Sequence, residues 1–463
     1  MQTLSPHDIH FYPAVRAYRR GGRSYFVNTY TGTWAALSSR YAKAFSEGLL
    51  SQTYSVDFYE AYEALAKSYI VRDLCYAEKR QNAEIKPLLV KFQTTGKCNF
   101  SCVYCFNDTT IRTKTMDRQT MRSAVDYAFT NPYAKNGLYF TIYGGEPLMD
   151  RGLLYDTIDY IYHKNSPDIK ACINIITNGA LLTVEDVSFL KSRGVRVSIS
   201  FDGMPKFQNR NRPDTVGLST SEAVIRGIRL LDNYDEMCVL TTVTHDMSDH
   251  LLDIALYVQS LGVPYLEFLP LRMLGCAEGR SDISVNVAAY IKSLKTIVYA
   301  IEDGRINQLG VRAILRMLLP LETGQTLHGE LGDRRCGSGR NIISINFDGT
   351  ITGCDMMPPA FTPVIGDVWR GITDLDSLDR LLMPYGRVSP FCNRCPWTLF
   401  CRSGCTGASG SDGETCNSRH LLSCAVNKEI YPWLLEKLVT DGGVLHSYFM
   451  SHTKSNRGEQ GDE

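Results

Sequence analysis

Three features that would direct the chain to a membrane, to secretion or to nucleic acid are missing from the sequence. No apolar run reaches the length that spans a bilayer. The N-terminus, Met1-Gln2-Thr3, has no basic region followed by an apolar stretch, so we expect no signal peptide. Lys plus Arg and Asp plus Glu number 49 each, and a net charge of zero gives no electrostatic reason to bind nucleic acid. We expect a cytoplasmic protein.

Cysteine, by contrast, is abundant. The chain has 15 cysteines in 463 residues and no export signal. In a reducing compartment, such cysteines indicate metal or redox use rather than disulfides. The length predicts two or three domains, and the hydrophobic content of 44% is typical of a globular protein.

Three of the cysteines lie within eight residues. Cys98, Cys102 and Cys105 are spaced C-x3-C-x2-C, with Tyr104 before the last and Phe106 directly after it. Thiolates at this spacing can converge on one metal centre. A structural zinc site requires four ligands, and no fourth ligand lies beside these three cysteines in the sequence. An iron–sulfur cube held by three cysteines instead leaves one iron open to a substrate or cofactor. A zinc knuckle or a chance cluster is the alternative.

Six strand–helix repeats follow from about residue 87. The apolar strands alternate with helical stretches at 118–129, 153–163, 184–191, 221–231 and 251–261. This alternation predicts a mostly parallel sheet with right-handed crossovers, and an active site at the carboxyl ends of its strands. The expected strands are Leu88–Thr94, Leu138–Tyr143, Ala171–Ile176, Val195–Phe201, Cys238–Thr244 and Tyr265–Leu269.

Polar or glycine-rich elements follow three consecutive strands of this set. Glycines there would let the backbone approach a ligand closely, and the carboxylate of Glu146 could accept from an ammonium group. Each element alone could be an ordinary turn. They are Gly144-Gly145-Glu146-Pro147, Thr177-Asn178-Gly179 and Ser200-Phe201-Asp202-Gly203.

The cysteine loop and the three strand ends together resemble the radical SAM superfamily. The resemblance implies a partial six-stranded barrel and a [4Fe–4S] cluster whose open iron takes the amino and carboxylate groups of S-adenosylmethionine. It further implies that the Gly144–Pro147 motif, through Glu146, contacts the methionine amino group. Thr242 or Val243 would lie near the adenine. Polar groups for the ribose and carboxylate would come from Thr177, Asn178, Ser200 and Asp202.

A second cysteine set lies in the C-terminal part of the chain. Alternating residues at 342–347 and 350–352 around Asp348-Gly349 predict a hairpin that brings Cys336 and Cys354 together. The set resembles the SPASM extension, which carries two auxiliary [4Fe–4S] clusters in enzymes that act on peptides; paired zinc ribbons are the alternative. By that resemblance one cluster takes Cys336, Cys354 and Cys405, and the other takes Cys392, Cys395, Cys401 and Cys424.

One departure from the SPASM pattern concerns the first auxiliary cluster. Residues 330–335 hold no cysteine, whereas some relatives have one there. That cluster would have an open iron or another ligand, for which His328, Asp333 and Cys416 are candidates. Asp355 directly follows Cys354, and an aspartate in this place is a candidate general base in the sulfatase-maturing relatives. A carboxylate that only hydrogen-bonds the hairpin is equally compatible with the sequence.

The remaining segments complete the expected domain plan. Short strands at 11–18, 25–27 and 33–37 and helices at 41–50 and 56–71 resemble the domains that bind leader peptides by strand addition. A packing extension of the barrel is the alternative. Helices at 287–301 and 311–319 would bridge the barrel to the cysteine-rich region. We expect an N-terminal recognition-like domain at 1–86, the barrel at 87–282, the bridge at 283–330, the SPASM domain at 331–450 and a disordered tail at 451–463.

The resemblance implies a peptide maturase. A 5′-deoxyadenosyl radical would take hydrogen from a ribosomally made precursor peptide and form a C–C, ether or thioether cross-link. A low-potential donor such as flavodoxin or ferredoxin would supply the electron. An anaerobic sulfatase-maturing enzyme, which oxidises Cys or Ser to formylglycine, is the alternative, although the roughly 85 residues before the barrel and the incomplete first cluster count against it. A non-catalytic metal-binding scaffold for peptides is a third interpretation.

Overall fold

The structure, a computed structural model, describes most of the chain. The described residues are 10–11, 15–28, 32–51, 55–68, 70–72, 87–107, 112–323, 337–356, 363–377, 392, 395–401, 404–405 and 421–453. Cys336, Cys416, His328 and Asp333 therefore lie outside them, as does Cys75.

The predicted α/β barrel is confirmed. Among the described residues, its strands belong to an eleven-stranded sheet in the order β12-β11-β10-β9-β8-β7-β6-β13-β14-β15-β16. Neighbours from β6 to β12 pair in parallel. The six barrel strands start and end within two residues of their predicted bounds, and are β6 (Leu88–Thr95), β7 (Leu138–Gly144), β8 (Ala171–Thr177), β9 (Arg196–Ser200), β10 (Met237–Val243) and β11 (Tyr265–Pro270).

Helices connect these strands, and local capping explains where several begin. Asp117 accepts from the backbone of Thr120 at the start of α3, and Thr183 with Asp186 forms a capping box at the start of α5. One helix, α6, was not predicted. The helices of this part are α3 (Arg118–Thr130), α4 (Arg151–Lys164), α5 (Val184–Ser192), α6 (Pro205–Asn211), α7 (Ser221–Leu230) and α8 (Leu251–Ser260).

Beyond β11 the chain forms the two expected bridging helices. The second begins one residue later than predicted, because the preceding residue belongs to a short strand beside β11. Single turns of 3-10 helix occur at Pro132–Asn136, Pro147–Asp150, His245–Met247, Gly275–Ala277 and Ser281–Ile283. The bridging elements are α9 (Val287–Glu302), β12 (Gly310–Val311) and α10 (Arg312–Thr323).

The N-terminal part forms a three-stranded antiparallel sheet, β2-β3-β4 (the N-terminal sheet), a two-stranded one, β1-β5, and two helices. Two predictions were wrong here. The strand predicted at 11–18 is two strands, because the first pairs with β5 and the second with β3. The helix predicted to reach Val71 ends at Lys67, and Val71 pairs with Phe11 instead. The elements are β1 (His10–Phe11), β2 (Val15–Arg20), β3 (Arg23–Asn28), β4 (Trp34–Ser38), α1 (Ser39–Ser51), α2 (Val56–Lys67) and β5 (Val71–Arg72).

The C-terminal part is joined to the barrel through its sheet. The predicted hairpin is present around Gly349, and its first strand, β13, pairs in parallel with β6. Helix α15 extends to Thr453, three residues into the segment predicted as a tail. The elements are β13 (Ile342–Ile345), β14 (Thr350–Thr352), β15 (Val364–Asp367), β16 (Gly371–Ile372), α12 (Thr398–Cys401), α14 (Leu421–Thr440) and α15 (Val444–Thr453).

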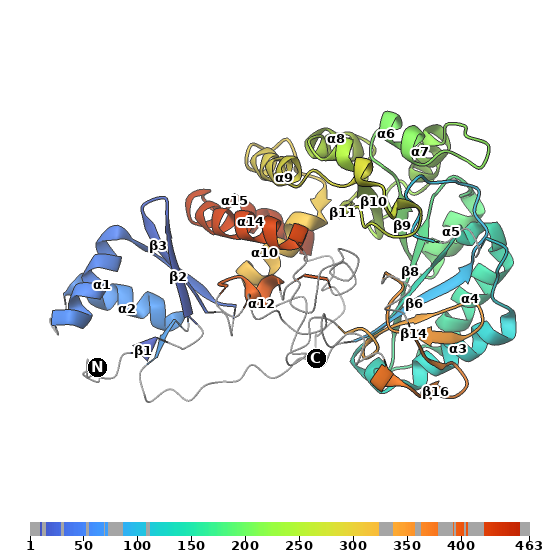
Figure 1. The fold of residues 1–463 in the computed structure, drawn as a ribbon, viewed down its shortest axis with the longest axis horizontal. Helices are drawn as coiled ribbons and strands as arrows, with labels where there is room; N and C mark the ends of the chain where they lie inside the picture. The colour runs from blue at the N-terminus through green and yellow to red at the C-terminus, as the bar shows by residue number, and fades with distance from the viewer. Residues whose placement is uncertain are drawn as a thin grey trace.

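The last helices contact both other parts of the molecule. In Figure 1, α14 and α15 lie between the N-terminal sheet and the barrel. Arg20 at the end of β2 donates to Glu436 of α14 at 2.6 Å, and the ring of Tyr18 meets Trp397 edge-on at 5.5 Å. The indole of Trp34 donates to the carbonyl of Leu321 in α10. Within the described part of the chain, no helix is both long and apolar enough to cross a membrane.

Candidate active site

The Cys98–Cys105 loop follows β6 and is fixed by backbone hydrogen bonds to distant segments. Ser101 donates to the carbonyl of Pro213 at 2.8 Å, and Val103 to that of Asn211 at 2.9 Å. On the other side, the amide of Cys276 donates to the carbonyl of Cys105 at 2.8 Å. The loop that follows α6 and the turn that follows β11 thus hold the three cysteines in place.

The three thiols lie close enough for their charges to interact. Burial raises the pKa of Cys98 to about 12 and of Cys102 to about 11, and the neighbouring cysteines add to both rises. Burial also raises the pKa of Cys105. Three buried thiols crowded in this way gain from binding a metal centre, because the metal compensates the thiolate charge. The donor set therefore fits an iron–sulfur cluster.

The two glycines after β7 pack against the backbone that leads into the cysteine loop. A Cβ on Gly145 would lie 2.2 Å from the carbonyl oxygen of Lys97 and 2.4 Å from that of Gly96. A Cβ on Gly144 would lie 2.0 Å from the carbonyl oxygen of Thr95. The amides of Gly145 and Glu146 also donate to this backbone. The glycines thus permit a close approach between two strand ends, whereas the sequence had suggested a close approach of the backbone to a ligand.

Glu146 lies fully buried at the centre of this arrangement. Its Oε1 accepts from the amide of Leu148 at 3.0 Å and from the hydroxyl of Thr177 at 2.7 Å, and its Oε2 accepts from the amide of Asn178 at 2.6 Å. Burial raises the pKa of Glu146, and the three donors oppose that rise. The carboxylate ties the end of β7 to the end of β8, so the two motifs found in the sequence form one structure.

Replacing Glu146 by alanine should destabilise the protein strongly. Three buried donors would lose their acceptor, and an unsatisfied buried donor costs about 1–3 kcal/mol. We expect the free energy of unfolding to fall by about 3 kcal/mol or more in denaturant titrations of the apo chain. The matched control is Glu222→Ala on the exposed start of α7, which should change it by less than about 0.5 kcal/mol. Equal effects of the two changes would show that Glu146 is not structural.

Asn178 links the second strand end to the cysteine loop itself. Its side-chain amide donates to the side chain of Asn99 at 2.8 Å, between the first two cysteines. Its own Oδ1 accepts from the amide of Ala180. Pro147 is buried at the start of the 3-10 turn that follows β7, and Ser200 is half-buried at the end of β9. All these predicted cofactor-binding residues lie at the carboxyl end of the sheet.

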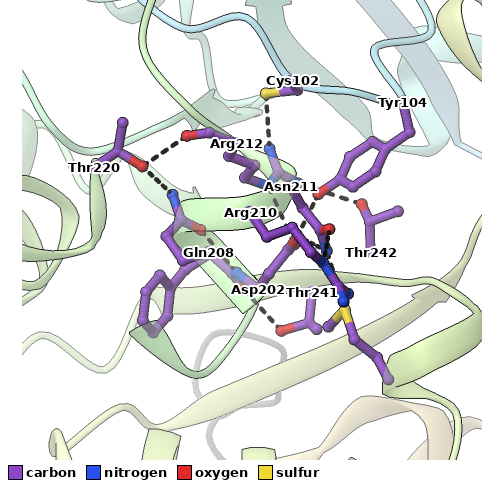
Figure 2. Close-up of polar contacts among 12 residues, drawn as sticks. Cys102, Tyr104, Asp202, Gln208, Arg210, Asn211, Arg212, Thr220, Thr241 and Thr242 are labelled. Atoms are coloured by element: carbon purple, nitrogen blue, oxygen red, sulfur yellow. Dashed lines mark hydrogen bonds and ion pairs between the residues drawn. The ribbon is translucent and has the colours of Figure 1, made fainter. Parts of the chain in front are cut away.

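Asp202 belongs to a buried polar network that Figure 2 shows in full. Its carboxylate accepts from Tyr104 at 2.6 Å, from Asn211 at 3.0 Å and from Arg212 at 3.1 Å. Arg212 also donates to the hydroxyl of Thr242 at 3.2 Å and lies 3.9 Å from the sulfur of Cys102. Arg212 was missed by the sequence analysis. It lies nine residues after the third motif, which is too far for a local sequence pattern to reveal it.

The grouping of the auxiliary cysteines stays a prediction. Burial raises the pKa of Cys395 and Cys401, and the nearby charges of Cys392 and Cys424 add to both rises, so these four lie near one another. Cys354 is instead influenced by Cys405. Among the described residues, no three His, Cys, Asp or Glu side chains converge tightly enough for a single metal ion. A cluster of four irons is wider than one ion, and the thiol chemistry of both groups fits it.

Asp355 is largely buried near the end of β14 and faces the barrel strands. Its carboxylate lies 4.0 Å from the ammonium nitrogen of Lys91 in β6. It also accepts a hydrogen bond from the hydroxyl of Tyr143 in β7. Burial and the nearby charge of Asp355 raise the pKa of Tyr143. Tyr143 in turn stacks on Phe106, with ring centroids 6.2 Å apart. Two aromatic rings therefore connect Asp355 to the residue that follows Cys105.

The fold and this site define a radical SAM domain. The model of the Radical SAM superfamily matches residues 92–258, which include the cysteine loop and all three strand-end motifs. The chain is an enzyme, and the superfamily that residues 92–258 match implies a [4Fe–4S] cluster and S-adenosylmethionine as cofactors of that part. The third interpretation, a non-catalytic scaffold, is therefore wrong.

Curated proteins and solved structures resemble the chain beyond that domain. The serine-type anaerobic sulfatase-maturating enzyme of Klebsiella pneumoniae is 25% identical over 332 residues, which cover 68% of this chain and 81% of that protein. The radical SAM cyclopropyl synthase TigE of Paramaledivibacter caminithermalis is 26% identical over 196 residues, 39% of this chain and 40% of that protein.

Two solved structures share the fold. Native anSMEcpe with bound AdoMet has a TM-score of 0.65 at 21% identity, and the match covers 78% of this chain and all of that one. Streptococcus suis SuiB bound to the precursor peptide SuiA has a TM-score of 0.54 at 13% identity. This second match covers 90% of this chain and 99% of that one.

Proposed function

We propose that the protein is a cytoplasmic maturase that forms a side-chain cross-link in a ribosomally made precursor peptide by radical SAM chemistry. The observation that carries the proposal is the shared sheet. Through β13 and β6, the hairpin of Cys354 and Asp355 is part of the barrel that ends in the Cys98–Cys105 loop. A substrate held in the barrel would then face both the Cys98–Cys105 loop and the auxiliary cysteine Cys354.

Each group of cysteines has a separate task in this proposal. Cys98, Cys102 and Cys105 hold the cluster that binds S-adenosylmethionine, and when bound this cluster supplies the electron for cleaving the cofactor. Thr177, Asn178, Ser200 and Asp202 with Gly144–Pro147 orient the cofactor at the strand ends. The auxiliary ligands are Cys336, Cys354 and Cys405 for one cluster and Cys392, Cys395, Cys401 and Cys424 for the other. A low-potential flavodoxin or ferredoxin is the electron donor.

Asp355 is the proposed proton acceptor. Forming a bond between two side chains removes two hydrogens from the peptide. The 5′-deoxyadenosyl radical would take one as an atom, and the other would leave as a proton while the remaining electron passes to an auxiliary cluster. A buried carboxylate beside Cys354 is well placed to take that proton. The ammonium group of Lys91 lies 4.0 Å from the same carboxylate.

The N-terminal sheet is the proposed binding site for the leader segment of the peptide. It offers strand edges to which an extended peptide can add. The match to SuiB, a structure bound to a precursor peptide, covers more of this chain than the match to anSMEcpe does.

Sulfatase maturation is the second candidate, and the relative from Klebsiella pneumoniae supports it equally. That reaction oxidises one Cys or Ser to formylglycine. It needs the same clusters and the same proton acceptor, so the site itself does not separate the two activities.

One experiment separates them. The reconstituted enzyme would be incubated without oxygen with S-adenosylmethionine, dithionite and two synthetic peptides, one a precursor encoded beside it and one carrying a sulfatase motif. We expect the precursor to lose two hydrogens and to show a cross-link by tandem mass spectrometry. Since oxidation of Ser to an aldehyde also removes two hydrogens, each product would be treated with an aldehyde-reactive hydrazide. Labelling of the sulfatase peptide without a cross-linked precursor would overturn the proposal.

A further inference from the structure

We propose that Arg212 sets the reduction potential of the cluster on Cys98, Cys102 and Cys105 by donating a hydrogen bond to the sulfur of Cys102. Arg212 is then a positioning residue, because it acts through a cluster ligand. The inference rests on the proposed ligation by these three cysteines. It is independent of the peptide substrate and of the bond that the enzyme forms.

Each of the three nitrogens of the Arg212 guanidinium has a polar contact. Nε donates to Asp202 at 3.1 Å, Nη2 to Thr242 at 3.2 Å, and Nη1 lies 3.9 Å from the sulfur of Cys102. Its flat face lies over the ring of Tyr104, with Cζ 5.2 Å from the centroid. A side chain held in this way, about 90% buried, cannot turn away from the sulfur.

In the described part of the chain, Cys102 is the one of the three whose sulfur accepts a hydrogen bond from a charged side chain, although the charges of Arg112 and Arg212 also act on Cys105. The sulfur of Cys98 accepts from the amide of Phe100 at 3.4 Å, and Cys105 from the amide of Asn107. Both are neutral backbone groups. Cys102 instead faces a buried cation, and hydrogen bonds to charged donors are roughly twice as strong as neutral ones.

The direction of the effect follows from charge. Reduction adds one electron to the cluster, and hydrogen bonds to the sulfurs and nearby positive charge stabilise that added negative charge. Arg212 therefore raises the potential. Asp202 opposes it, because its carboxylate pairs with the same guanidinium and neutralises part of its charge. The two residues should shift the potential in opposite directions, which a purely structural role would not do.

The test is a redox titration of the reconstituted protein without S-adenosylmethionine. The EPR signal of this cluster is assigned by its absence from the Cys98→Ala/Cys102→Ala/Cys105→Ala chain. In Arg212→Gln, we expect the ratio of reduced to oxidised cluster at a fixed potential to fall about tenfold, a shift of about 59 mV for one electron. In Asp202→Asn the ratio should rise, because the guanidinium keeps its full charge. Arg212→Lys should lie between wild type and Arg212→Gln.

The matched control is Arg210→Gln, two residues earlier. Arg210 is exposed and pairs with Asp246, so its replacement should leave the potential unchanged. Unchanged potentials in Arg212→Gln, or shifts of the same sign in Arg212→Gln and Asp202→Asn, would overturn the proposal. If Arg212→Gln fails to take up iron, the potentials of Asp202→Asn and Arg212→Lys test the proposal instead. Wild-type potentials in both variants would refute the proposal. Failure of peptide cross-linking leaves these titrations interpretable.

Discussion

Replacing Gly145 by alanine is expected to abolish iron binding by the Cys98–Cys105 loop. The new Cβ would lie 2.2 Å and 2.4 Å from two backbone carbonyl oxygens, of Lys97 and Gly96, directly before the first cysteine. Backbone cannot rotate away as a flexible side chain can, so β6 and β7 must separate at their ends. Overpacking of this kind costs about 1–3 kcal/mol and should displace the loop.

Iron content and S-adenosylmethionine cleavage would measure the effect of this change. We expect the alanine variant to lose about four irons per chain, and to form 5′-deoxyadenosine at least about a hundredfold more slowly, about 2.7 kcal/mol in activation free energy. The control is Gly152→Ala in α4, where the nearest atom to the new Cβ would be the end of the flexible Arg118 side chain at 3.3 Å. That variant should keep its iron and cleavage rate. Full iron in Gly145→Ala would show that the loop adapts.

Replacing Cys102 or Cys395 should separate two activities that the proposal assigns to two cysteine groups. Cys102→Ala removes a ligand of the cluster that binds the cofactor. We expect at least about a thousandfold slower formation of 5′-deoxyadenosine, about 4 kcal/mol, with or without peptide. Cys395→Ala removes a ligand from the group of four near α12 and α14. Formation of 5′-deoxyadenosine should persist while cross-linked product falls at least about tenfold, about 1.4 kcal/mol.

The matched control is Cys238→Ala, a buried strand cysteine that lies in neither group. It should retain iron and both activities apart from a modest loss of stability. If Cys395→Ala lost the cofactor cleavage as completely as Cys102→Ala, the two groups would not act separately. The division of tasks in the proposal would then be wrong.

The barrel and its motifs could be predicted because their signals are local. The six strands are short apolar runs, and capping residues such as Asp117 and Thr183 mark where helices begin. The grouping of the auxiliary cysteines stays a prediction that the SPASM resemblance implies, and Cys336 lies outside the described residues. Each of these inferences needs only residues close together in the sequence, or a resemblance that the spacing carries.

Several of the unpredicted features depend on contacts between distant segments. Arg212 shows no pattern around it, and its role arises only when α6 brings it to Cys102, 110 positions away. The sequence indicated a carboxylate at Glu146 but not that it would point inward to Thr177. The pairing of Phe11 with Val71 shortened a helix that local periodicity favoured. Propensity does not encode which distant backbone will compete for a hydrogen bond.

The parallel pairing of β13 with β6 makes the auxiliary region part of the barrel rather than an appendage. Ile342 to Ile345 lie opposite Leu89 to Phe92, so the hairpin closes an edge of the strand that carries the first cysteine loop. A barrel cut free of this hairpin would present that edge of β6 unpaired, and open strand edges recruit other chains. Shortening the protein to its cofactor-binding half should therefore yield aggregates. The two halves must therefore be engineered as one piece.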